Sequence, residues 1–486
     1  MDQPAIVQSL ESDEQPRFSY PVAIESLRNK TEYGVIVRCT EADDNKDDLV
    51  DLDKLRADVQ DYHPAERLGL ELSKWDLTYR LSHFVGAVWL QKPAGKEPGI
   101  VLAVQPKIAD LNAVRMFVEV ATSPDYSHEA SSDRLFDCEP SQPAMEGVTL
   151  PDMTLLQVAV YLRALSQFCQ RNLRQDFART RENLIGRVKG RILISANIRQ
   201  NTVRGRSDRV VCEFTRMTLD TPANRILKVA LVCCAHYLSI GPTLPPLLDW
   251  LRQCDAALAE VSDATITDAD FRGMVYSGLM QRYRRVHGLA RMILKRLSTD
   301  ANGQIPKQPS QTVPFYLNMW RLFELYVGVQ LAKTGKRFKP QSQYSLPFTI
   351  DGKEVGSIGF RPDYCLPEDE GVIVDAKYKS IIDSAMPEEG SLISLSGLQF
   401  ANGVQPGNAD VYQVIAYCDL FTVINPKSTF KIAVLMAPGA PQCEIPDRFD
   451  WNEFIGRGAT LDLGTRRIIV LPCPVPKRQA VPSDNY

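Results

Sequence analysis

The stretch Arg361-Pro-Asp363-Tyr-Cys-Leu-Pro-Glu-Asp-Glu-Gly-Val-Ile-Val-Asp375-Ala-Lys377-Tyr-Lys379 decides the fold of the C-terminal part of this chain. Two short runs typical of strands flank a polar turn, and this pattern predicts two strands joined as a hairpin. Side chains alternate between the faces of a strand, so Asp375 and Lys377 should point the same way, with Asp363 facing them from the partner strand. Two carboxylates beside a lysine predict a site for a hard cation, suited to metal-assisted cleavage of a phosphodiester.

Composition sets the broad class of the protein. The chain has 486 residues, of which 44% are hydrophobic and 24% charged, as in ordinary globular proteins. At about 150 residues per domain, we expect two to four domains. The N-terminus lacks the pattern of a signal peptide, and the best membrane-span candidate, 226–240, is too short and contains Lys228 and His236. The 11 cysteines include no Cys-x-x-Cys pair, which disfavours a zinc site and favours free thiols in a reducing cytoplasm.

Changes in composition along the chain predict an α+β multidomain protein. We expect disorder over 1–18, a β-rich region over 19–150, a helical region with a β-ribbon over 151–298, an α/β region over 313–471 and a tail over 472–486. Within the β-rich region, strands are expected as far as about residue 120, followed by an irregular connector over 123–151. Further along, the patterns predict helices over 155–174, 222–238, 245–258, 271–297 and 315–331, and strands over 184–198 and 209–214 around a basic loop.

Other polar residues in the C-terminal region join the hairpin in a known order. Glu324 lies beside the apolar stripe of the expected 315–331 helix, and Gln413 and Tyr417 share one face of a later helix at i and i+4. Taken singly, each is typical of an exposed or satisfied polar residue. Together, Glu on a helix, Pro-Asp, Asp-x-Lys and Gln-x-x-x-Tyr form the ordered pattern of the PD-(D/E)xK nuclease core, which the chain therefore resembles.

The resemblance narrows to one family. The chain is similar to McrC, the nuclease subunit of the McrBC modification-dependent restriction systems, from about residue 86 onward. Upstream, 183–192 resembles a basic, glycine-containing strand of that family, 221–228 resembles its Asn-Arg-x-Leu-Lys helix start, and 104–108 is a weaker match. The segments that carry the resemblance most strongly are Trp320-Arg-Leu-Phe-Glu324, Arg361-Pro-Asp363, Val374-Asp375-Ala-Lys377-Tyr-Lys379 and Tyr412-Gln413-x-x-x-Tyr417.

The resemblance implies a catalytic role for each matched residue. Asp363 and Asp375 would bind Mg²⁺, and Glu324 would add a ligand directly or through water. Lys377 would position the attacking water or stabilise developing charge, and its acidic neighbours favour its charged form over a role as general base. The remaining two matched residues would hold the cleaved strand or brace the metal ligands, namely Gln413 and Tyr417.

The resemblance also implies partners. McrC-like subunits pair with McrB, a hexameric AAA+ GTPase that binds modified double-stranded DNA and translocates it, and their N-terminal part enters the pore of the hexamer and stimulates GTP hydrolysis. The chain has no Gly-x-x-x-x-Gly-Lys-Ser/Thr loop of its own, consistent with a dependent role. Two alternatives stay open: a stand-alone nuclease in repair or defence, and an activator of an AAA+ motor that does not itself cleave.

Basic residues outside the motifs are candidates for DNA phosphates. Lys379 shares a strand face with Lys377, and two arginines flank Gly205 on the expected loop, where they could touch either DNA or the GTPase ring. The full set expected to bind DNA is Lys379, Arg361, Arg284, Arg285, Arg204 and Arg206.

Overall fold

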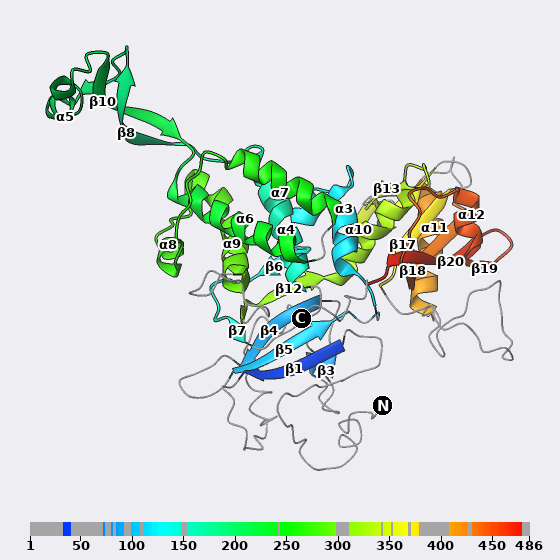
Figure 1. Ribbon diagram of the computed structural model, residues 1–486. Helices are drawn as coiled ribbons and strands as arrows, with labels where there is room; N and C mark the ends of the chain where they lie inside the picture. The colour runs from blue at the N-terminus through cyan, green and yellow to red at the C-terminus, as the bar shows by residue number, and fades with distance from the viewer. Residues whose placement is uncertain are drawn as a thin grey trace, which may run out of the picture. The chain divides into compact units, whose positions relative to one another are not determined.

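The computed structural model describes residues 33–39, 71–72, 79–80, 84–91, 99–106, 108, 110–146, 153–241, 244–297, 311–341, 344–350, 353–367, 371–378, 408–424 and 430–478. Helices and sheets are mixed, as the α+β expectation required, and the chain divides into two compact units (Figure 1). Residues 1–160 together with 306–486 form the first unit, and 161–305 form the second. The predictions for 1–18, for most of the tail and for Lys379 lie outside the described residues.

The first unit contains an antiparallel sheet in the order β1-β5-β4-β12-β6. The prediction of a helix over 315–331 is wrong for its first four residues, which form strand β12 between β4 and β6. The reason is that three consecutive buried apolar residues suit a strand that is covered on both faces. Gly86 permits this insertion, since a Cβ there would lie 2.1 Å from the carbonyl oxygen of Phe315. The strands are β1 (Tyr33–Cys39), β4 (Phe84–Gln91), β5 (Gly99–Gln105), β6 (Phe136–Cys138) and β12 (Phe315–Asn318).

A helix follows this sheet where strands and then an irregular connector were expected. Helix α3 (Ala113–Thr122) begins where the Asn112 side chain accepts a hydrogen bond from the Arg115 N–H, and this cap outweighs the β-branched residues of the segment. The expected connector contains β6, the 3-10 turn η2 (Glu129–Ser131) and β7 (Met145–Glu146), which pairs with β11 (Gln311–Thr312).

The second sheet of the first unit has the order β13-β16-β17-β18-β20-β19, and a separate hairpin pairs β14 with β15. Strands β17, β18 and β20 are parallel, while β16 and β17 form the expected antiparallel hairpin. Strand β20 continues five residues past the expected boundary at 471, because 472–476 still pair with β18. The strands are β13 (Lys339–Pro340), β14 (Tyr344–Ile350), β15 (Lys353–Phe360), β16 (Tyr364–Leu366), β17 (Val372–Ala376), β18 (Ile432–Gln442), β19 (Ala459–Asp462) and β20 (Arg467–Pro476).

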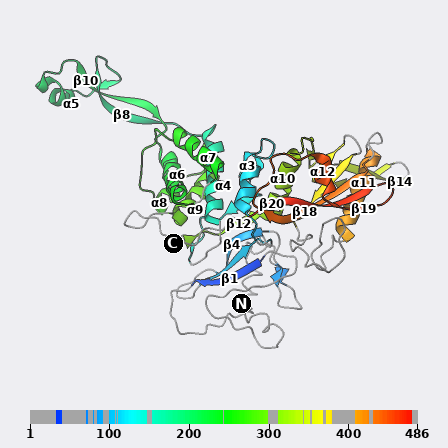
Figure 2. The same ribbon diagram turned by 45° about the vertical axis from the view of Figure 1, so that its right-hand side comes forward.

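Helices cover this second sheet (Figure 2). Helix α11 (Asn408–Ile424) packs Val414, Cys418 and Phe421 into an apolar core with strand residues such as Ile373 and Leu435. Two further helices belong to this part of the first unit, α10 (Met319–Ala332) and α12 (Trp451–Gly456).

The second unit is a helical body that carries a long ribbon (Figure 1). Helix α6 starts as expected at Pro222, with the Thr221 hydroxyl accepting from the Asn224 N–H. It is long and apolar enough to cross a membrane by composition, yet its apolar face is buried against α9. The helices are α4 (Met153–Cys169), which begins just before this unit, α6 (Pro222–Ile240), α7 (Pro245–Ala257), α8 (Asp268–Arg272) and α9 (Tyr283–Leu297).

Two expectations for the second unit need correction. The strand expected over 184–198 is interrupted, because Gly186 and Gly190 adopt positive φ and turn the chain before helix α5 begins at residue 194. The helix expected over 271–297 is three pieces, α8, the 3-10 turn η4 (Gly278–Arg282) and α9. The ribbon consists of β8 (Asp176–Ile185), β9 (Arg191–Ile192) and β10 (Arg209–Thr218), with α5 (Ile194–Gln200) and η3 (Thr202–Arg204) between the last two.

Candidate active site

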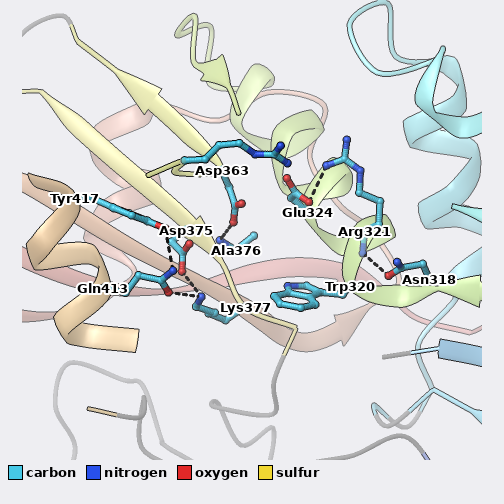
Figure 3. Close-up of a pocket in the computed structure, with 11 residues that line it drawn as sticks. Asn318, Trp320, Arg321, Glu324, Asp363, Asp375, Ala376, Lys377, Gln413 and Tyr417 are labelled. Carbon is cyan, nitrogen blue, oxygen red and sulfur yellow. Dashed lines mark hydrogen bonds and ion pairs between the residues drawn. The ribbon is translucent and has the colours of Figure 1, made fainter. Parts of the chain in front are cut away.

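A cleft of about 260 Å³ in the first unit collects all six residues expected to be catalytic (Figure 3). The β16–β17 hairpin pairs Tyr364 with Val374, which places Asp363 just before one strand and Asp375 near the end of the other. The residues that line the cleft are Asn318, Trp320, Arg321, Glu324, Arg361, Asp363, Asp375, Ala376, Lys377, Gln413 and Tyr417.

A chain of polar contacts crosses the cleft from strand to helix. Lys377 Nζ lies 2.7 Å from Asp375 Oδ2 and donates a 2.8 Å hydrogen bond to Gln413 Oε1. Gln413 Nε2 donates in turn to the Tyr417 hydroxyl at 2.9 Å. The i, i+4 spacing on α11 thus aims both polar side chains at the hairpin (Figure 3).

The two aspartates are buried together at a cost to their charged forms. Burial, the Asp375 carboxylate and the Glu324 carboxylate raise the pKa of Asp363 to about 8, although its Oδ2 accepts a 2.7 Å hydrogen bond from the Ala376 N–H. Burial also raises the pKa of Asp375, against the opposing charge of Lys377. Both carboxyl groups therefore favour their protonated forms more than exposed aspartates do.

Lys377 keeps its proton in this setting. Burial alone would lower the pKa of its amine, but Asp375, Asp410 and Asp363 together raise it. Asp410 lies 3.9 Å from Lys377 Nζ and is 6% exposed, yet the sequence motif did not single it out. The available signal was its place one helical turn before Gln413 on α11.

Glu324 lies in the same cleft but is already engaged. Its Oε2 atom is 2.8 Å from Arg321 Nη1, and its Oε1 atom accepts a hydrogen bond from the Gln341 amide. Its backbone carbonyl accepts a 2.7 Å hydrogen bond from the Tyr364 hydroxyl. Sequence reasoning missed Arg321 and Gln341, although the spacing of three residues between Arg321 and Glu324 on one helix was a usable signal.

The donor set fits Mg²⁺ held by two carboxylates. Among the described residues, no three His, Cys, Asp or Glu side chains come together as a ready-made metal cluster. The Oδ2 atom of Asp375 is buried and forms an ion pair with Lys377 Nζ at 2.7 Å. A cation that keeps several of its waters needs one or two such carboxylates, so Asp363 and Asp375 suffice.

Comparison with known proteins places the chain in a family. The model of the McrBC 5-methylcytosine restriction system component matches residues 80–427, a span that includes every catalytic candidate. The chain belongs to this family. No curated protein matches it.

Two solved structures are similar to this McrBC-family chain at low identity. One is a half-complex of Thermococcus gammatolerans McrB AAA+ hexamers with bound McrC, 13% identical, with a TM-score of 0.35, covering 88% of this chain and 90% of the other. The second is a Thermococcus gammatolerans McrBC complex, 14% identical, with a TM-score of 0.27, covering 60% of this chain and 82% of the other.

The basic residues of this McrBC-family chain lie in several places. Arg361 is exposed and lines the cleft. Arg284 is exposed on α9 with its guanidinium 5.9 Å from the centre of the Tyr276 ring, whereas Arg285 is half-buried, and burial lowers its pKa to about 10. The two remaining arginines are exposed in the ribbon on either side of Gly205, namely Arg204 and Arg206.

Proposed function

We propose that the chain is the Mg²⁺-dependent DNA endonuclease subunit of a restriction complex, built on a PD-(D/E)xK core within 313–471. The observation that carries this proposal is the buried pair Asp363 and Asp375 beside a charged Lys377 in one cleft. Burial raises the pKa of both carboxyl groups, the charge of Asp375 raises that of Asp363 further, and perturbed groups of this kind gather at functional sites. Family membership supports the same reading.

Each residue has a separate task in the proposed reaction. Asp363 and Asp375 would hold Mg²⁺, which when bound lowers the pKa of a water molecule and offsets the charge of the scissile phosphate. Lys377 keeps its charge and is fixed by Asp375 and Gln413, so its amine can hold a phosphate oxygen or the attacking water. Tyr417 fixes Gln413 in turn.

Replacing Asp375 by Asn tests the site. The change keeps the shape of the side chain and removes the charge, so plasmid cleavage with Mg²⁺ should fall at least ~10²-fold while the protein stays folded. Arg457→Gln, which alters an exposed ion pair with Glu453, is the matched control and should cleave as wild type. Full cleavage by Asp375→Asn would refute the assignment.

We also propose that the chain works with a McrB-like AAA+ GTPase hexamer on modified double-stranded DNA. Family membership supports a partner of this kind. The ribbon offers a surface for it, since apolar side chains exposed together are typical of protein contacts. These exposed side chains include Phe177 (70%), Ile185 (60%), Val188 (56%), Ile194 (69%), Val203 (76%) and Met217 (57%).

The apolar surroundings favour the GTPase ring over DNA as the target of Arg204 and Arg206. Ile194→Ser combined with Val203→Ser should lower stimulation of the partner's GTP hydrolysis at least ~10-fold and leave unfolding unchanged, because both side chains are already exposed. Unaltered stimulation would move the partner surface to the 19–150 region, where the sequence resemblance places it.

A single cleavage experiment separates this proposal from its two alternatives. Methylated and unmethylated plasmids are incubated with the chain and Mg²⁺, with and without the AAA+ partner and GTP. Cleavage of methylated plasmid only with partner and GTP is the expected result. Cleavage by the chain alone would establish a stand-alone nuclease, and stimulated GTP hydrolysis without cleavage would establish an activator.

A further inference from the structure

Arg321 lies between two glutamates that come from distant parts of the first unit. It stands in the first turn of α10, where its Nη1 atom is 2.8 Å from Glu324 Oε2. Its Nη2 atom is 3.3 Å from Glu129 Oε2 in the 3-10 turn η2. The side chains of Arg321 and Glu324 are only 18% and 13% exposed, so solvent screens this contact weakly.

The engagement of Glu324 distinguishes it from the two aspartates of the cleft. Glu324 has both of its oxygens engaged, one by Arg321 and the other by the Gln341 amide, whereas the contacts of Asp375 with Lys377 and of Asp363 with the Ala376 N–H involve one oxygen each. A carboxylate with both oxygens engaged has little lone-pair density left for a metal ion.

We propose that Arg321 withholds Glu324 from the metal site, and that Glu129 is the alternative anchor to which Arg321 turns when Glu324 is released. The inference rests on the proposed nuclease function and concerns the state of its third acid. Arg321 is then a positioning residue that acts through Glu324. A guanidinium suits this role because its several donors let it bridge two carboxylates and shift between them without losing its charge.

The elements around Glu129 connect it to helix α10, so a change there could alter the pairing of Arg321. Glu129 lies between α3 and β6, upstream of the cleft by almost 200 residues. Strand β6 pairs with β12, which leads directly into α10, and the rings of Phe136 and Phe315 stack with centroids 6.0 Å apart. A partner that moves η2 or β6 would therefore alter the pairing of Arg321, and with it the number of carboxylates that face the metal.

Metal binding to the full-length chain without DNA tests this inference. Mn²⁺ is used in place of Mg²⁺, and its dissociation constant is measured by calorimetry for the wild type and the variants. Arg321→Gln should bind Mn²⁺ roughly tenfold more tightly, because a third carboxylate becomes available. Glu324→Gln alone should leave the affinity within about twofold of wild type, because Glu324 is withheld there.

The double variant separates ligation from simple charge removal. Arg321→Gln with Glu324→Gln should return to the affinity of wild type. If the tenfold gain persists without Glu324, the effect is long-range electrostatics and the inference fails. Arg252→Gln, which breaks an exposed i, i+3 pair with Asp249, is the matched control and should change nothing.

Glu129→Gln gives an independent readout. Without its second anchor, Arg321 belongs wholly to Glu324, so the affinity for Mn²⁺ should not rise and should stay within about twofold of wild type, as for Glu324→Gln. A purely structural role for the cluster would shift Arg321→Gln and Glu129→Gln in the same direction, and that outcome would overturn the inference. If wild type binds no Mn²⁺, or Asp375→Asn binds it equally well, the proposed function fails instead.

Discussion

The cleft of the first unit and the polar core around Asn224 and His287 in the second unit both bury polar groups. Only the polar core provides these groups with matching hydrogen-bond partners. In the polar core, Asn224 is fully buried, and its amide nitrogen donates to the carbonyls of Arg174 and Leu219 at 3.0 and 2.7 Å. Its oxygen accepts from the Tyr283 hydroxyl at 2.8 Å. Asn224 thus ties together the two ends of the ribbon, just before β8 and just after β10.

His287, in the same polar core, is also buried with matching partners. Burial lowers the pKa of His287 to about 4, and its ring nitrogens meet the Tyr276 hydroxyl and the Ala223 carbonyl. The ring is therefore neutral and fully partnered. In the cleft, by contrast, the carboxylates of Asp363 and Asp375 oppose each other. Buried polar groups that match one another stabilise a fold, whereas buried groups of like charge destabilise it.

The largest effect expected from this contrast is the loss of chemistry in the cleft. Lys377→Ala should reduce cleavage by about 10³-fold, because it removes the one positive charge that Asp375 and Gln413 hold in place. The rate of plasmid linearisation is the measurement, with circular dichroism to check the fold. A variant that retained a tenth of the wild-type rate would contradict the role given to Lys377.

The next largest effect falls on the stability of the polar core. Asn224→Ala should lower the free energy of unfolding by about 2–4 kcal/mol, because two carbonyls and a hydroxyl lose their partners inside the protein. Urea unfolding measures the change. Tyr283→Phe removes the bond to Asn224 Oδ1 and the 2.7 Å bond that the hydroxyl accepts from the Arg174 N–H, and should cost less, about 1–2 kcal/mol. A loss below about 0.5 kcal/mol for Asn224→Ala would show that the core does not depend on this network.

Neutralising a cleft carboxylate should raise the free energy of unfolding, whereas the changes in the polar core lower it. Asp363→Asn should stabilise the metal-free protein at pH 7 by about 1–3 kcal/mol, because an amide of the same shape is buried without charge. The pKa of Asp363 is about 8 in the folded chain against 3.8 when exposed, so the unfolded chain releases its proton first. Wild type should therefore lose stability relative to the variant as the pH rises from about 4 to about 8.

The matched control and the metal sharpen this prediction. Asp447→Asn neutralises an exposed carboxylate and should leave the unfolding free energy unchanged. Saturating Mg²⁺ should stabilise wild type by roughly 2 kcal/mol and Asp363→Asn by much less. Equal stabilisation of both proteins would mean that the ion binds elsewhere.

The smallest effect is expected at an exposed pair that is neither buried nor in conflict. Arg457 and Glu453 lie 2.7 Å apart with side chains 49% and 67% exposed. Arg457→Gln should change the unfolding free energy by less than about 0.5 kcal/mol, since solvent competes for both charges. Thermal unfolding measures it, and a larger loss would mean that charge pairing on the surface stabilises this protein as much as buried polar contacts do.

Local patterns were sufficient for much of the first unit's site and for one helix start in the second unit. The hairpin around Asp363 and Asp375, the shared face of Gln413 and Tyr417, and the start of α6 at Pro222 all follow from periodicity and capping within one or two elements. The same patterns failed where long-range contacts decided the outcome. Residues 315–318 have the apolar run of a helix but form a strand, because β4 and β6 offer them a place between two partners.

The sequence by itself determined which side chains share a face, because that follows from the geometry of a single strand or helix, and its resemblance to the nuclease pattern implied which elements meet. Only the tertiary structure decided the pKa values of those residues and which other side chains contact them. Gln341 and Glu129 carry no motif, and they reach the neighbourhood of Glu324 only through packing between segments far apart in the chain. Burial, which depends on the whole fold, then raises the pKa of Asp363 and of Asp375 above that of an exposed aspartate.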